Sequence, residues 1–341
     1  MYLMKYFSKK LLVNVTGIFF LVVLISGTAN AQSLIPSFGD ARSGTSGFQF
    51  TKIAVDARSA GMGLSNVADA KDASSLYWNP ALASQAQGSE VMLAHTAYFA
   101  DISMEYLAYM QKYKAFSFGG SVQYLNSGEM QETTEFDHRG TGRTFRTVHM
   151  AVGLTASHKI TDLFSYGLTL KYLTERIEEV SINSAAIDFG FFYQVGETGL
   201  RFSVGLNNFG LDASPSGKTV RPTQEGEEVE DDFEDISLPT RFIISTAYDV
   251  YQSDDINAVL TAQISNPSDN SEQFSVGGEL GYKNMFFLRA GYQFGYQEVQ
   301  LPSFGAGLKL PVYGKNIYAD YSFSPYDRLG SLHRIGLRFT L

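Results

Sequence analysis

The 341-residue sequence contains no cysteine. Without a thiol the chain cannot form disulfides, bind a metal through thiolates or carry the lipid of a lipoprotein. Histidine is scarce as well, and the spacing of its five copies does not match a metal site. We therefore predict no metal and no cofactor; the histidines are His95, His138, His149, His158 and His333.

The short motifs of common enzymes are also missing. The sequence has no G-x-S-x-G, no H-E-x-x-H, no P-loop and no G-x-G-x-x-G after a predicted strand. Gly61-Met62-Gly63 is too short to cradle a phosphate. A catalytic triad need not be local in sequence, but no residue argues for one, and we predict that the chain is not an enzyme.

Positive charge is concentrated in a predicted signal peptide, residues 1–31. Three lysines precede an apolar stretch from Leu11 to Ile25, and Ala29-Asn30-Ala31 fits the rule for signal-peptide cleavage. A retained membrane anchor is the alternative, because the apolar stretch approaches spanning length. Without these lysines, 23 basic residues face 35 acidic ones, a net charge of −12. This balance disfavours nucleic-acid binding.

The chain from Glu90 onward repeats a period of two. In Phe116–Tyr124 and in Phe164–Tyr172, large apolar residues alternate with Gly, Ser, Thr, Gln or Lys. In Phe286–Phe294 the polar face carries Arg289, Gly291 and Gln293. Strict alternation indicates strands. The 20 tyrosines, 26 phenylalanines and 32 glycines favour one large β unit over two ordinary domains.

The alternation fits a soluble sandwich or a membrane barrel. Sandwich strands are shorter and carry more charge on the polar face, whereas many segments here have the length that crosses a bilayer when tilted. We predict an all-β fold, an antiparallel transmembrane barrel of about fourteen strands. The expected strands are 90–98, 102–111, 115–124, 147–159, 163–177, 184–194, 199–207, 238–250, 256–266, 271–282, 285–295, 302–311, 316–323 and 332–341.

The connections between these strands support the barrel. Every second connection is short, and the other set contains the two longest loops, Leu125–Arg146 and Asn208–Ser237. Bacterial barrels have short periplasmic turns opposite longer extracellular loops. We therefore predict an outer-membrane protein, surrounded by lipid, with both termini in the periplasm.

The segment Asp56–Leu82 breaks the alternation. It mixes small residues with a predicted helical turn that Asp72 would cap and that Asn79-Pro80 would end or restart. A barrel of this width needs a plug, and we predict that residues 32–89 form a lead-in and a lumenal hatch before the barrel at 90–341. The alternative is a surface turn on the rim. The candidate hatch residues are Asp56, Arg58, Gly61, Gly63, Asp72, Tyr77, Trp78, Asn79 and Pro80.

Two further segments are candidate sites. The loop Glu225–Asp235 holds eight acidic residues. It could bind calcium or a partner, or it could be a solvated loop that its like charges keep extended; the spacing is not that of an EF-hand. The candidate ligands are Glu227, Glu228, Glu230, Asp231, Asp232, Glu234 and Asp235.

The last strand alternates to the final residue of the sequence. Gly336, Phe339 and Leu341 resemble the C-terminal signal by which outer-membrane barrels are recognised for insertion. Such an octamer is weakly specific alone. Together with the predicted signal peptide and the unequal loops, it supports the membrane barrel.

Three runs carry a family resemblance. DARSAGMG at 56–63, DASSLYWNPAL at 72–82 and HTAYFADISMEYLAYM at 95–110 resemble the PorV/PorQ family of the FadL-like outer-membrane superfamily. The resemblance covers the mature chain, and Asn79–Ala81 is its most specific part. It implies a hatch inside the barrel and a source among Bacteroidota or related bacteria. PorV-like members carry cargo from the type IX translocon to the surface attachment complex, to which PorQ-like members belong.

The resemblance leaves two functions open. The first is a non-enzymatic interaction protein of type IX secretion, which binds secretion-system or cargo proteins through its loops and rim. The second is a passive channel for hydrophobic small molecules, as in FadL-like transporters. A channel should have an apolar pocket near the hatch and a route through the wall, whereas an interaction protein should have a blocked lumen. The sequence features disagree on the assignment within the family. PorV-like members are resembled by Asp56–Ser59 and Trp78–Pro80, whereas PorQ-like members are closer in chain length and at Asn79–Leu82.

Overall fold

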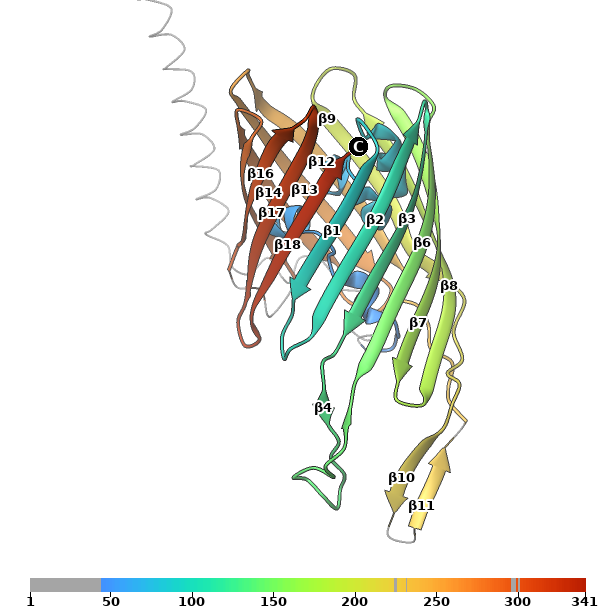
Figure 1. The fold of residues 1–341 in the computed structure, drawn as a ribbon. Coiled ribbons are helices and arrows are strands. Elements are labelled where there is room, and N and C mark those ends of the chain that lie inside the picture. The colour runs from blue at the N-terminus through green and yellow to red at the C-terminus, as the bar shows by residue number, and fades with distance from the viewer. Residues whose placement is uncertain (1–43, 224–225, 231, 296–298, 300) are drawn as a thin grey trace, which may run out of the picture. The chain divides into compact units, whose positions relative to one another are not determined.

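The computed structural model describes residues 44–341 apart from 224–225, 231, 296–298 and 300. The predicted signal peptide lies outside the described residues. The described chain forms a closed barrel of 14 antiparallel strands (Figure 1). The strands of the barrel are β1 (Glu90–Ala97), β2 (Ser103–Tyr113), β3 (Phe116–Asn126), β6 (Thr147–Lys159), β7 (Phe164–Ile177), β8 (Val180–Gln194), β9 (Leu200–Gly210), β12 (Arg241–Gln252), β13 (Ile256–Pro267), β14 (Gln273–Tyr282), β15 (Phe286–Phe294), β16 (Ser303–Val312), β17 (Lys315–Tyr326) and β18 (Gly330–Thr340).

These strands confirm the predicted antiparallel barrel. Each predicted segment overlaps one observed strand, and β1 pairs with β18 to close the barrel. The long loops hold more structure than expected. One contains a short hairpin of β4 (Met130–Gln131) and β5 (Thr144–Phe145), and the other contains β10 (Thr219–Thr223) and β11 (Gly226–Glu230). Both hairpins extend from the end of the barrel opposite the C-terminus (Figure 1).

The outer surface of the barrel is apolar, which explains the period of two. On β7, Leu168 and Leu170 are exposed and lie between the exposed Tyr166 and Tyr172. The intervening residues of that strand point inward, and Thr169 is buried. An aliphatic band with aromatic residues at both ends matches a barrel wall in a bilayer. No helix among the described residues is long and apolar enough to cross a membrane.

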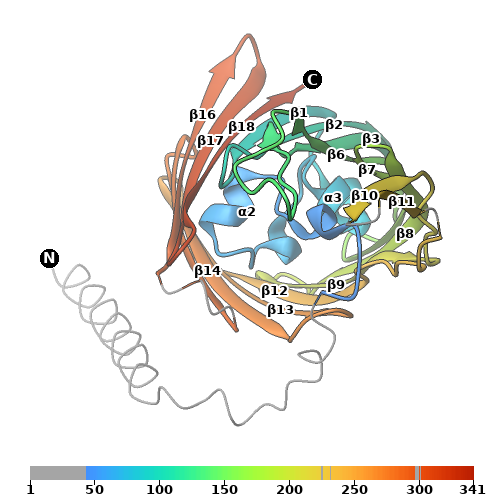
Figure 2. The same cartoon turned by 90° about the horizontal axis from the view of Figure 1, so that it is seen from below.

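The hatch lies inside the barrel, as predicted for Asp56–Leu82 (Figure 2). Its described residues contain five short helical elements, and the bridge Ser46–Ser237 joins the lead-in to the connection that precedes β12. Most hatch side chains are buried, so the alternative of a surface turn is wrong. The elements are η3 (Gln49–Lys52), α2 (Ala57–Gly61), η4 (Val67–Asp69), α3 (Ser75–Trp78) and η5 (Pro80–Gln85).

Glycines let the hatch backbone touch the wall. A Cβ on Gly61 would lie 2.8 Å from the Cα of Gly305 on β16. Gly63 has a φ of +62°, and its Cβ would lie 2.6 Å from the amide nitrogen of Tyr292. From the wall side, a Cβ on Gly167 would lie 2.5 Å from the carbonyl carbon of Pro80, and one on Gly291 would clash with Met62. Glycine usually weakens a strand. On the inward face of this wall it instead allows the hatch backbone to approach the strand closely.

We expect Gly291→Ala to unseat the hatch. Its methyl group would collide with the Met62 backbone, and overpacking of this kind costs about 1–3 kcal/mol. Hydrogen exchange of the hatch amides should become faster, and small solutes should cross liposomes carrying the variant faster.

Gly120→Ala is the matched control. Gly120 faces outward beside the exposed Tyr109, and its new Cβ would have 3.8 Å to the nearest atom. Equal exchange rates in the two variants would contradict the seating role of Gly291.

Candidate functional site

Asp56 joins the start of the hatch to its only tryptophan. Its Oδ2 accepts from the Ser59 N–H (2.7 Å) and so caps helix α2. Its Oδ1 accepts from Trp78 Nε1 (2.7 Å). Burial raises the pKa of the Asp56 carboxyl, and the hydrogen bonds from Trp78 and Ser59 oppose that rise. The cap and the indole contact fix α2 against α3, although 22 residues separate Asp56 from Trp78.

Arg58 connects the hatch to the wall. Its Nε and Nη2 donate to the Glu279 carboxylate on β14 (2.9 and 3.0 Å), and Nη2 also donates to Asp69 (2.6 Å). Burial disfavours the cation, but Glu279 and Asp69 raise the pKa of Arg58 well above its usual value. The guanidinium is therefore charged and matched by two carboxylates, which makes a charge-assisted link.

The ion pairs continue around the wall. Arg289 on β15 contacts Glu279 (2.6 Å) and Asp320 of β17 (2.6 Å). Arg201 on β9 contacts Asp69 of the hatch (3.0 Å) and Asp249 of β12 (2.6 Å). A buried charge is tolerated when it is paired and hydrogen-bonded. The network thus holds the hatch to both sides of the lumen.

Asp72 closes the network, but its predicted role needs correction. Helix α3 begins at Ser75, with Ser74 at the cap position, so Asp72 is not the N-cap. Its Oδ1 instead accepts from the amide and hydroxyl of Ser74 (2.9 and 2.6 Å). Its Oδ2 accepts from Arg338 of β18 (2.8 Å). Burial opposes ionisation, yet Arg338 and Arg58 hold the pKa of Asp72 below its usual range. Asp72 therefore pairs with an arginine of the wall and does not cap helix α3.

Asn79-Pro80 ends one helix and starts the next, as predicted. The Asn79 Oδ1 accepts from the Ala81 N–H (2.9 Å) and caps η5, and Pro80 occupies its first turn. The Nδ2 donates to Ser203 Oγ (2.7 Å) and to the Val204 carbonyl (3.0 Å). Gly190 leaves room for this amide, because any Cβ there would overlap it. Asn79 is therefore a cap and a wall contact at once.

Tyr77 and Trp78 fill the centre of the hatch. Both are buried, and their rings meet edge to face with centroids 4.7 Å apart. The Tyr77 hydroxyl donates to the Thr51 carbonyl (3.0 Å). The Arg241 guanidinium of β12 lies 5.9 Å from the Tyr77 ring and 5.5 Å from the Trp78 ring. All nine candidate hatch residues therefore lie in one buried assembly with the wall.

The acidic segment lies apart from the hatch. Glu227, Glu228 and Glu230 belong to strand β11, so this part of the acidic segment forms one strand of a hairpin. Pairing with β10 supplies the backbone hydrogen bonds that a solvated loop would leave to water. Asp231 lies outside the described residues, and Asp232, Glu234 and Asp235 are exposed. Among the described residues, no group of three acidic or histidine side chains is arranged to hold a metal ion.

The C-terminal residues join the last strand of the barrel to the first. Gly336 pairs with Ala94 and Phe339 with Val91 across the β1–β18 seam. The Leu341 N–H donates to the Ser89 carbonyl (2.8 Å). Their role as an insertion signal stays a prediction.

Sequence reasoning missed the charged wall residues of this network: Glu279 and Arg338, which bind the hatch, and Asp320, which binds Arg289 and Arg338. Each is buried and points into the lumen. The available signal was their position on the polar face of an alternating strand, where a charge is rare unless it is paired. The sequence could not show their partners, because the contacts with Arg58 and Asp72 span more than 200 residues.

Solved structures with the same architecture define the class of this barrel. The toluene transporter TbuX of Ralstonia pickettii superposes with a TM-score of 0.58 at 12% identity, over 84% of this chain and 98% of that chain. The toluene transporter TodX of Pseudomonas putida gives 0.55 at 13% identity, over 83% and 96%. A FadL homologue of Pseudomonas aeruginosa gives 0.51 at 12% identity, over 84% and 96%. At these identities the likeness shows the fold alone, that of a FadL-like outer-membrane barrel.

The sequence places the chain within this class. The family model described as type IX secretion system protein PorV matches residues 37–266. The chain belongs to the PorV family. A search of curated proteins finds no match.

We expect Asn79→Ala to loosen the hatch, and Trp78→Ala to act in the same direction. Asn79→Ala removes the η5 cap and the donors to the wall, a loss of about 2–3 kcal/mol. Asn79→Asp keeps the cap oxygen but turns a carboxylate toward the Val204 carbonyl, so it should be at least as harmful. Permeability of liposomes to small sugars would report both changes.

Asn183→Ala on the exposed face of β8 is the control. Unchanged permeability in folded Asn79 and Trp78 variants would argue against a lumenal plug held by these residues.

The charge network predicts a pH-dependent effect of Asp72→Asn. Removing one partner of a buried pair costs about 3–5 kcal/mol, and Asp72 pairs with Arg338 and Arg58. The folded-state pKa lies below 3.8, so this stabilisation is complete above about pH 3.8 and is lost as pH falls through the lower, folded value. Urea midpoints should differ most near neutral pH and converge in acid.

Asp162→Asn is the control for this prediction. Asp162 pairs with Lys159 at an exposed turn, and such pairs contribute little to stability. A difference between Asp72→Asn and the parent that stays constant down to strongly acidic pH would contradict the assignment.

Proposed function

We propose that this barrel is a non-enzymatic component of type IX secretion that binds translocon proteins, attachment proteins or secreted cargo through its loops and rim. The observation that carries the proposal is the occupied lumen. Hatch residues bond to β9, β14 and β18, and η5 packs against β6, β7 and β8. A hatch bonded to several strands of the wall leaves the loops and the rim as the surface for binding partner proteins.

The two long hairpins are the candidate partner surface. They extend beyond the barrel at the end opposite the short turns (Figure 1). Because short turns are periplasmic in bacterial barrels, we place the hairpins outside the cell and the C-terminus in the periplasm. Asp232, Glu234 and Asp235 are exposed beside the β10–β11 hairpin. They suit a basic patch on a partner, since complementary charge steers association.

A hydrophobic channel is the second candidate. The solved toluene transporters have this fold, and the register shifts between Ile187 and Phe189 at the β8–β9 pairing, as a wall opening would require. In this chain the irregular site is occupied. Asp188 is buried there, 2.5 Å from Lys171 Nζ, and accepts from the Asn208 N–H (2.7 Å). A charged, hydrogen-bonded pair is a poor lining for an apolar route.

Shortening the hairpins should separate the two functions. One variant replaces residues 132–143 with a short linker, and a second variant lacks residues 219–230. We expect each change to abolish or strongly reduce the recovery of secretion partners. The barrel should still fold, because neither segment belongs to its wall. The measurement is mass spectrometry of proteins that co-purify with the barrel in mild detergent.

An epitope inserted at the exposed Tyr313–Gly314 turn, at the opposite end, is the control. Recovery of a translocon barrel or of proteins with a type IX sorting domain supports the secretion role. A parent barrel recovered alone, under conditions that preserve other outer-membrane complexes, would shift the assignment to the channel.

A further inference from the structure

A polar cavity lies between the hatch and the wall. Its volume is about 310 Å³, and Trp78 of the hatch lines it. Tyr98 and Asn270, which also line it, belong to connections at the hairpin end of the barrel, and Tyr326 is the last residue of β17 at that end. The cavity therefore opens toward the hairpin end, on the far side of the hatch from the short turns. Its size is at the lower limit of small-molecule pockets.

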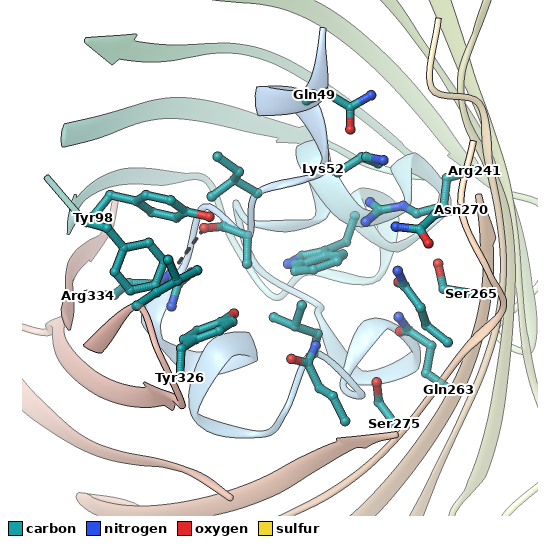
Figure 3. Close-up of a pocket in the computed structure, with 18 residues that line it drawn as sticks. Gln49, Lys52, Tyr98, Arg241, Gln263, Ser265, Asn270, Ser275, Tyr326 and Arg334 are labelled. Atoms are coloured by element: carbon teal, nitrogen blue, oxygen red, sulfur yellow. Dashed lines mark hydrogen bonds between the residues drawn. The ribbon is translucent and has the colours of Figure 1, made fainter. Parts of the chain in front are cut away.

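Two buried arginines line this cavity from different parts of the wall (Figure 3). Arg241 of β12 is 5% exposed and Arg334 of β18 is 4% exposed. Nε and Nη2 of Arg241 have no hydrogen-bond partner among the described residues, and its guanidinium lies over the rings of Tyr77 and Trp78. Within the part of the chain that the structure describes, Arg334 donates to the Ala54 carbonyl (3.3 Å) and, at 3.5 Å, to the Ser324 hydroxyl.

The other arginines of the lumen are different. Arg58, Arg201, Arg289 and Arg338 each contact at least one carboxylate within 3.0 Å, all toward the short-turn end. Within the described part of the chain, neither Arg241 nor Arg334 has a carboxylate within 4.0 Å. An uncompensated buried cation is costly. Two such arginines on one cavity, with no carboxylate beside either of them in the described part of the chain, make this cavity a candidate site for an anionic ligand.

The strands next to Arg241 offer neutral hydrogen-bonding groups. Gln263, Ser275 and Gln293 are direct cross-strand neighbours on β13, β14 and β15, and Ser265 pairs with Gln273 one step along. All five line the cavity. The Gln263 Oε1 and the Ser265 Oγ are buried without a partner among the described residues. Buried polar groups normally have partners, so this ladder is suited to a ligand with hydroxyl or amide groups.

We propose that this cavity binds a small, polar organic acid. Its carboxylate pairs with Arg241 or Arg334, and its hydroxyl or amide groups bond to the ladder of Ser and Gln side chains. Guanidinium groups match carboxylates in geometry and charge, and the aromatic rings of Trp78 and Tyr98 provide flat surfaces for the ligand's body. The carboxylate can come from an acidic peptide end or from an acidic sugar. This site does not depend on the secretion role proposed above.

Calorimetry on the purified full barrel in detergent tests the proposal. The probes are an acidic dipeptide and glucuronate, with the dipeptide diamide and glucose as neutral counterparts and inorganic sulfate as a plain anion. We expect at least one acid to bind and its neutral counterpart not to bind. Binding of the dipeptide alone identifies a peptide end as the source, and binding of glucuronate alone identifies an acidic sugar.

Variants test whether the two arginines bind the carboxylate of the acid. Arg241→Gln and Arg334→Gln should each weaken binding of the acid by about tenfold or more, with no loss of thermal stability. Arg289→Gln, which breaks a paired arginine, should lower the unfolding temperature, and Arg139→Gln on an exposed loop should change neither property.

A fixed carboxylate provides a second test. Ser265 faces inward on β13, diagonal to Arg241 across the β12–β13 pairing. We expect Ser265→Asp to replace the ligand's charge, raising the unfolding temperature and abolishing binding of the acid, whereas Ser265→Ala should retain it. The proposal is overturned if no acid binds, if sulfate or the neutral probes bind equally well, or if both arginine variants bind as the parent does or lose the barrel.

Discussion

The need to satisfy every backbone hydrogen bond inside the membrane governs this structure. Lipid offers no donors or acceptors, so the sheet must close on itself, and it does so where β18 pairs with β1 along eight residues of each strand. Closure creates a lumen too wide for the wall's own side chains. The chain then fills that space with its N-terminal segment, whose backbone is irregular. Each irregular turn needs partners, and the inward face of the wall provides them.

The wall provides those partners in two forms. Where the hatch backbone approaches closely, the inward residue is glycine, as at Gly167 and Gly291. Where a hatch side chain is charged, the inward residue carries the opposite charge, as Glu279 does for Arg58 and Arg338 does for Asp72. Such pairs add less to net stability than their short distances suggest, because desolvation offsets the attraction. Their larger effect is on position, since a shifted hatch would leave several charges buried alone.

This division explains what the sequence could predict. The period of two is a property of each strand, so the fourteen strands and the unequal connections were visible without any partner. The start of η5 at Asn79-Pro80 was also visible, because a proline and its preceding cap act locally. The role of Asp72 was not, since Arg338 lies 266 residues away and changes which atoms the carboxylate binds. The place of Gly190 on a strand likewise gives no local sign that it makes room for Asn79. A contact between distant segments is visible in the sequence only as a glycine or a charged residue on the inward face of a strand. The sequence does not show which residue is its partner.

The distribution of charge divides the lumen into two unlike halves. Toward the short turns, Arg58, Arg201, Arg289 and Arg338 are all matched by carboxylates of the hatch and wall. Toward the hairpins, Lys52 pairs with Asp269, whereas Arg241 and Arg334 face a cavity with neutral Ser and Gln side chains in its lining. A lumen selected only for closure would gain from apolar residues at both arginines, since well-packed apolar side chains can replace buried charge without loss of stability. Two buried arginines with no carboxylate beside them among the described residues cost stability, as do the unpaired hydrogen-bonding groups of Gln263 and Ser265. This cost supports the proposal that the hairpin-side half of the lumen binds a ligand.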